Sequence, residues 1–152
     1  MTIAAEFETE IARPVDEVFD SLAAVERWPT WLVASGIRRV VLPDRGPIGV
    51  GSQLIVDQAV AGRSTTLDAR VVGFEPGRRL GLEGRDPEGI RVRIDAAVTQ
   101  ADIPERSRLR FSLRVDVPLR YRMFEGMVAP QARRAIALDL ESFRRQLEAA
   151  PG

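Results

Sequence analysis

The chain has 152 residues, a formal net charge of zero from 22 basic and 22 acidic side chains, and neither cysteine nor histidine. This length favours one domain, and the balanced charge argues against a dedicated nucleic-acid binder or a partner of anionic membranes. Without cysteine no disulfide or thiolate site can form, and without histidine the commonest general base and metal ligand is missing. The N-terminus lacks a signal-peptide pattern and no stretch is long enough to span a bilayer, so we expect a soluble, cytoplasmic protein without stable membrane insertion.

The first predicted element is a strand over residues 2–11, where one face is apolar and the other is polar. Pro14, followed by Asp16 and Glu17, predicts a helix start, because the acids lie near the positive end of the helix dipole. The apolar stripe of this short helix consists of Val15, Val18, Phe19 and Leu22.

Trp28 and Trp31 are the only tryptophans and stand three positions apart, so they lie close together on a second short helical turn. Their rings either close one end of a cavity or anchor the short helices to the sheet. Residues 33–36 are predicted as a loop and residues 37–42 as a strand. The glycine-rich segment 43–51 is not a phosphate loop, because its spacing differs and a strand rather than a helix follows it.

Five further strands are predicted over residues 52–60, 64–74, 78–84, 89–99 and 106–117. Gly, Pro or Asp stands in each connector, and such short connections favour antiparallel neighbours. One face of the sheet is apolar throughout, and the other carries Arg, Asp and Glu. The acids of that second face should be solvated and therefore poor bases at neutral pH; they are Asp57, Asp68, Glu83, Asp95 and Asp116.

A single long helix is predicted from residue 119 to 149, and it is the only element large enough to cover the apolar face. Its apolar stripe is Ile136, Leu140, Phe143 and Leu147. Charged residues, Asp139 and Glu141 among them, are predicted on the opposite face. Pro130 follows Gly126 by four positions and predicts a kink between them.

Four short motifs accompany this order of elements. They are IARPVDEVF at residues 11–19, VERWPTW at 25–31, GVGS at 49–52 and VVGFEPGRRL at 71–80. In this order they resemble the START-like (SRPBCC) superfamily, whose fold is called helix-grip, and most of all the bacterial polyketide cyclase/dehydrase family. The resemblance implies an α+β fold in one domain over residues 1–152. A curved antiparallel sheet of about seven strands would wrap around the long C-terminal helix, with two short helices after the first strand.

The resemblance also implies a deep apolar cavity between the sheet and the long helix. The candidate ligand-binding residues on the sheet are those in phase with its apolar face: Leu54, Val56, Gln58, Leu67, Ala69, Leu82, Val92, Ile94, Leu109, Phe111 and Leu113. Trp28 and Trp31 would form an end wall, and Met123, Phe124 and Met127 a roof. Tyr121 would stand at the mouth.

Few of these side chains can move a proton or bind a charge. Gln58 either orients a ligand by hydrogen bonding or lies in water near a strand end. The Tyr121 hydroxyl is either a weak acid and donor at the mouth or a half-buried group facing water, and Arg120 or Arg122 could clasp a carboxylate or phosphate. No cluster of oxygen ligands suggests a metal. We therefore predict no metal, no cofactor and no identifiable catalytic residue.

Three functions fit these observations. The first is a binding protein that encloses a hydrophobic or amphipathic small molecule, such as a lipid, isoprenoid, quinone or polyketide. The second is a cyclase or dehydratase that acts in the same cavity by positioning and water exclusion. The third is a protein-interaction module, which exposed apolar patches at the mouth would favour. The polar sheet face suggests a monomer or a homodimer.

Overall fold

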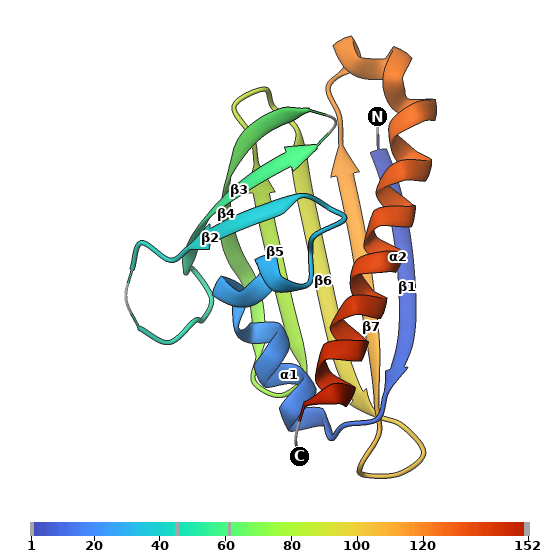
Figure 1. Ribbon diagram of the computed structural model, residues 1–152. Helices are drawn as coiled ribbons and strands as arrows, with labels where there is room; N and C mark the ends of the chain where they lie inside the picture. Colours follow the sequence, from blue (N-terminus) through green and yellow to red (C-terminus); the bar gives the residue numbers. More distant parts are fainter. Residues whose placement is uncertain (1, 45, 61, 151–152) are drawn as a thin grey trace.

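The computed structural model describes residues 2–44, 46–60 and 62–150, without the side chains of residues 60 and 122–128 (Figure 1). The elements in chain order are β1 (Thr2–Ile11), α1 (Val15–Ala23), η1 (Val25–Thr30), β2 (Ile37–Val41), β3 (Gln53–Val60), β4 (Arg63–Glu75), β5 (Arg79–Arg85), β6 (Arg91–Gln100), β7 (Ser107–Asp116), η2 (Leu119–Phe124) and α2 (Glu125–Ala149), where η denotes a 3₁₀-helix. The predicted α+β class and its order of elements are confirmed.

All seven strands form one antiparallel sheet in the order β1-β7-β6-β5-β4-β3-β2. Strands β2 to β7 follow one another as a meander, as their short connectors predict. The first strand, β1, pairs with the last, so that Thr2 lies opposite Asp116 and Ile11 opposite Ser107. Strands β1 and β2 therefore form the two edges of the sheet.

The long helix α2 lies along one face of the curved sheet, and its C-terminal end reaches α1 (Figure 1). The core forms between this face and the helices, and Ile136, Leu140 and Phe143 of α2 are buried in it, as their spacing predicts. No described helix is long and apolar enough to cross a membrane.

The predicted helix over residues 119–149 is not one element. Residues 119–124 form the 3₁₀-helix η2, and α2 begins at Glu125 and continues through Pro130. The local cause is the backbone hydrogen bond from the Tyr121 N–H to the Pro118 carbonyl oxygen (2.9 Å), which spans three residues rather than four. Leu119, the first residue of η2, is 76 % exposed.

Candidate functional site

The predicted wall residues share the sheet face that α2 covers. The side chains of the following are buried in the core: Leu54, Val56, Leu67, Ala69, Leu82, Leu109, Phe111 and Leu113. Val92 and Ile94 are only partly buried and pack against that core. The alternation of apolar and polar residues thus identified the inner face of the sheet.

Burial of the inner side chains changes along β6 and β7 from one end of the sheet to the other. Near the end of β1 and the start of β7, the inner side chains are at most 2 % exposed; examples are Ile11, Leu80, Val98 and Leu109. Helix α1 helps to cover this end, where Phe19 contacts Phe74 with ring centroids 5.8 Å apart.

At the opposite end, beside η2, three neighbouring apolar side chains are only partly buried. They are Val92, Ile94 and Val115, which we call the open-end patch. Val92 lies directly opposite Val115 on the adjacent strand, so the patch is continuous across β6 and β7. Part of the inner face is therefore available for an apolar contact that the described side chains do not supply.

The two tryptophans make contacts typical of core packing. The Trp28 Nε1 donates to the Leu22 carbonyl oxygen at 2.8 Å, and the Trp28 and Trp31 rings lie 5.9 Å apart. The Trp31 ring is 4.6 Å from that of Phe143 in α2. These contacts support the anchoring interpretation of the pair, and their role as an end wall stays a prediction.

Gln58 holds a loop, and its role toward a ligand or water stays a prediction. Its Nε2 donates to the Ser35 carbonyl oxygen at 3.0 Å. The same loop is held from the other side by Asp139 of α2, whose two carboxylate oxygens accept the N–H groups of Ala34 and Ser35, each at 2.8 Å.

The burial of Asp139 corrects the prediction that placed this residue on the polar face of the helix. The residue is 2 % exposed. It stands three positions after Ile136 and four before Phe143, so it lies beside the apolar stripe, and that spacing was the available signal. Two backbone donors satisfy the buried carboxylate, which makes it a structural group.

The Ser35 side chain was also missed. Its Oγ is shielded from solvent and, within the part of the chain that the structure describes, is the only such buried side-chain nitrogen or oxygen without a hydrogen-bond partner. Nothing in the local sequence distinguishes this serine from an ordinary loop serine.

Tyr121 belongs to a polar cluster at the same end as the open-end patch. Its hydroxyl donates to Glu88 Oε2 at 2.8 Å, and Glu88 also pairs with Arg63 at the start of β4. The Arg120 guanidinium lies 5.0 Å from the centre of the Tyr121 ring and donates to the Glu88 carbonyl oxygen. The hydrogen bonding and positive charge of Arg120 lower the pKa of Tyr121. The cluster joins η2 to the turns before β4 and β6.

The predicted roof cannot be placed in the same way. The side chains of Met123, Phe124 and Met127, and that of Arg122, lie outside the described residues. Their role in a roof or a head-group clasp stays a prediction.

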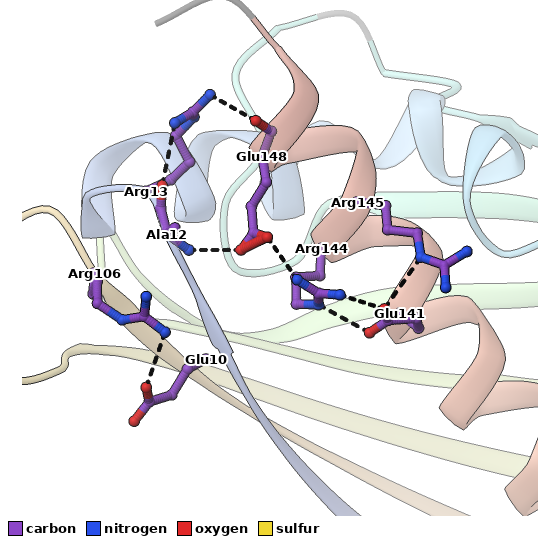
Figure 2. Close-up of polar contacts among 8 residues, drawn as sticks. All are labelled: Glu10, Ala12, Arg13, Arg106, Glu141, Arg144, Arg145 and Glu148. Atoms are coloured by element: carbon purple, nitrogen blue, oxygen red, sulfur yellow. Dashed lines mark hydrogen bonds and ion pairs between the residues drawn. The ribbon is translucent and has the colours of Figure 1, made fainter.

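A second polar cluster fixes the opposite end of α2, as Figure 2 shows. Glu148 Oε2 accepts the Ala12 N–H at 2.9 Å, and its Oε1 accepts from Arg144 at 2.6 Å. Arg13 donates to the Glu148 carbonyl oxygen at 3.1 Å, and Glu141 binds both Arg144 and Arg145. These bonds tie the C-terminal turn of α2 to the junction of β1 and α1.

The outer face of the sheet carries the charged residues, as predicted. Arg93 contacts both Glu83 and Asp95. Arg106 and Arg108 both contact Glu10, and Figure 2 shows the contact with Arg106. Arg108 and Arg106 lower the pKa of Glu10. These carboxylates serve ion pairs rather than proton transfer.

Described residues line at least two hollows. One, of about 520 Å³, lies among charged side chains of β4 to β6, including Arg70, Glu83 and Arg91. The other, of about 450 Å³, lies beside η1 and β2 and includes Val33 and Ile37. Of the predicted ligand-binding residues only Val92 lines either of them. Among the described residues there is no group of three or more acidic side chains that could hold a metal ion.

Known structures share this architecture over nearly its whole length. The Zhui aromatase/cyclase from Streptomyces sp. R1128 has a TM-score of 0.78 at 16% sequence identity, with 97% of this chain and 94% of that chain covered. A START superfamily protein from Mycobacterium smegmatis gives 0.76 at 15% identity, with 95% and 97% covered. The protein TTHA0849 from Thermus thermophilus gives 0.77 at 14% identity, with 98% and 99% covered.

These similarities define the class of fold, which is the helix-grip fold. The profile of the family described as polyketide cyclase/dehydrase and lipid transport matches residues 2–148. The chain belongs to that family. No curated protein sequence matches it.

Proposed function

We propose that the protein binds a hydrophobic or amphipathic small molecule between the inner face of the sheet and the N-terminal half of α2. The observation that carries the proposal is the open-end patch of Val92, Ile94 and Val115, which points inward yet is only partly buried. Removing apolar area from water favours binding by about 25 cal/mol per Å². A ligand that covered this patch would gain that energy, and membership of a family that includes lipid transport supports the proposal.

The first experiment is native mass spectrometry of freshly purified protein, with solvent extraction of any bound molecule. A reproducible stoichiometric adduct would support binding, and its structure would identify the ligand class. A bare mass, together with no thermal shift from fatty acids, quinones, isoprenoids or polyketide mimics, would contradict the proposal.

A pair of variants tests the position of the site. Ile94→Phe adds bulk at the open-end patch and should weaken ligand binding at least about tenfold, because overpacking a filled site is unfavourable. Val72→Phe makes a similar addition on the outer face, where Val72 is 38 % exposed, and serves as the control. Equal affinities for the two variants would place the ligand elsewhere.

A cyclase or dehydratase is the second candidate, and the Tyr121 cluster is the observation that favours it. A hydroxyl whose pKa is lowered by Arg120, beside the open-end patch, could serve as a weak acid toward a bound polyketide. For an enzyme, Tyr121→Phe should lower kcat by about a hundredfold or more. For a carrier, the same variant should change ligand affinity less than about fivefold.

A further inference from the structure

Three arginines stand close together on the outer face of the sheet, where β4, β5 and β6 lie side by side (Figure 1). Arg85 ends β5 and Arg91 begins β6, and the two residues are direct partners across these strands. Arg70 of β4 lies opposite Glu83, so it is the diagonal neighbour of Arg85. We call Arg70, Arg85 and Arg91 the arginine trio. Like charges directly opposite each other are unfavourable, because their Cβ atoms are only about 4.5–5.5 Å apart.

The acids beside the trio on β4 and β5 are bound by other side chains. Asp68 lies directly opposite Arg85, but its carboxylate accepts a hydrogen bond from Gln53 Nε2 at 3.0 Å. Glu83 binds Arg93 at 2.6 Å. Neither acid is therefore placed to neutralise the two facing arginines.

The same holds for the acid on β7. Asp116 lies opposite Arg91, but its carboxylate accepts from the Thr2 hydroxyl and lies 3.7 Å from Arg114. In the described part of the chain, no ion pair includes a member of the arginine trio. Water can hydrogen-bond these guanidinium groups, but only an anion can remove the repulsion between them.

The arginine trio lines the hollow of about 520 Å³ on this face, which we call the outer hollow. All three arginines are exposed, so an ion from solution can reach them. The described lining includes four arginines and three acids, which leaves an excess of positive charge. Val72, which is 38 % exposed, adds an apolar wall. The outer hollow therefore suits an anion that is attached to a small apolar group.

The number of arginines favours a phosphate over a carboxylate. A guanidinium group donates in a planar fork that matches either anion. A carboxylate has two oxygens and a single charge, whereas a phosphate monoester has three terminal oxygens and a charge of about −1.5 to −2 at pH 7. Only the phosphate offers one oxygen to each member of the trio.

We infer that the outer hollow is a binding site for a phosphate monoester, with Arg85 and Arg91 as its main contacts and Arg70 as the third. The site lies on the face of the sheet opposite the open-end patch, so it does not rest on the proposed function. A soluble phosphate ester and a lipid head group share this chemistry, and the experiment distinguishes them.

The test is an NMR titration of the protein with phenyl phosphate at low and constant ionic strength. The largest shifts should appear at the Nε–H groups of Arg85 and Arg91. Arg85→Gln should weaken binding about five- to tenfold, because a charged hydrogen bond is lost at an exposed site. Arg110→Gln removes the same charge from the outer face nearer the α1 end, where Arg110 pairs with Glu8, and should change the affinity less than about twofold.

Two results of this titration would overturn the inference. Equal losses in Arg85→Gln and Arg110→Gln would mean that phenyl phosphate responds only to the general charge of the face. Benzoate should bind at least about fivefold more weakly than phenyl phosphate, and equal affinities would contradict the assignment to a phosphate.

Thermal unfolding gives a second measure that does not depend on the probe. In a chloride buffer of low ionic strength, Arg85→Gln should raise the Tm, because it removes the repulsion with Arg91. At matched ionic strength, inorganic phosphate should raise the Tm of the unmodified protein more than that of Arg85→Gln. An equal rise in both proteins would overturn the inference.

Sedimentation with vesicles identifies the source of the phosphate. Retention of the unmodified protein, but not of Arg85→Gln, by phosphatidylcholine vesicles that contain phosphatidic acid would assign the site to a lipid head group. Retention of neither protein, with phenyl phosphate still bound, would assign it to a soluble phosphate ester. Failure of both phenyl phosphate and the vesicles to bind would overturn the inference and leave the proposed function, which concerns the inner face, intact.

Discussion

Asp139 connects the middle of α2 to the loop before β2 through two backbone N–H groups. Asp139→Ala leaves both donors without a partner and should lower the free energy of unfolding by about 3 kcal/mol. Asp139→Asn keeps one acceptor oxygen and should lower the free energy of unfolding by clearly less than Asp139→Ala does. Chemical denaturation measures both, and equal losses would mean that packing rather than hydrogen bonding explains the burial of this residue.

Position 36 requires glycine for two reasons, because its φ is positive and because there is no room for a Cβ. A Cβ at this position would overlap the Ala59 carbonyl oxygen, whereas a Cβ at Gly62, which has nearly the same φ, would meet nothing within 4 Å. Gly62→Ala should therefore cost only the left-handed conformation, about 1–2 kcal/mol. Gly36→Ala should cost at least about 2 kcal/mol more, because the backbone must move. Similar melting temperatures for the two variants would refute the argument.

Single residues were the part of the site least accessible to prediction. The Gln58–Ser35, Tyr121–Glu88 and Asp139–Ala34 bonds join positions 23, 33 and 105 residues apart. Hydrophobic periodicity shows which side of an element a residue occupies, but not which polar group from another element meets it there. For this reason Gln58 and Tyr121 were predicted as ligand or solvent contacts, and the structure gives both of them partners within the protein.

At the scale of elements, the cluster around Glu148 attaches α2 to the start of the fold. Glu148→Ala removes the acceptor of the Ala12 N–H and of Arg144, and should lower the free energy of unfolding by about 1–2 kcal/mol. Arg145→Ala removes an exposed ion pair on the same turn and should cost at most about 0.5 kcal/mol. Urea unfolding of both variants checks the difference, and equal losses would contradict a specific attachment by Glu148.

The ion pair between Glu141 and Arg144 should make the stability of the protein decrease at low pH. The hydrogen bond and charge of Arg144 lower the pKa of Glu141 from 4.5 to about 2. The stabilisation that the charged Glu141 gives through Arg144 is therefore complete above pH 4.5 and is lost as the pH falls toward 2. Between about pH 5 and pH 2 the Tm of the unmodified protein should fall further than that of Glu141→Gln. Parallel Tm curves would show that the ion pair contributes nothing measurable.

Elements were predictable where a periodic pattern extends over many residues. The alternation in residues 2–11 and 106–117 predicted β1 and β7 closely, because a half-buried strand requires it. The segment from 119 to 124 was mistaken for helix α2. Its apolar residues fit a helical stripe, but the turn after Pro118 and the contacts of Tyr121 with Glu88 favour a tighter turn. Those contacts come from a distant hairpin and leave no local pattern.

At the scale of the whole molecule, burial of the inner side chains of β6 and β7 decreases from the α1 end to the η2 end. Local opening needs less free energy where fewer apolar contacts are broken. The amides of Val98 and Leu109 should therefore exchange with solvent at least about ten times more slowly than those of Val92 and Val115. Hydrogen exchange followed by NMR measures this, and a ligand at the open-end patch should reduce the difference. Uniform exchange would mean that the sheet opens only as one unit.

The pairing of β1 with β7 has a consequence for synthesis in the cell. Thr2 meets Asp116 and Ile11 meets Ser107, so the partner of the first strand is made almost last. At about 5–20 residues per second, β1 leaves the ribosome on the order of 5–20 s before β7 exists. During that interval the nascent chain exposes an unpaired strand with an apolar face. The newborn protein should therefore be a client of ribosome-associated chaperones until its last strand and helix are released.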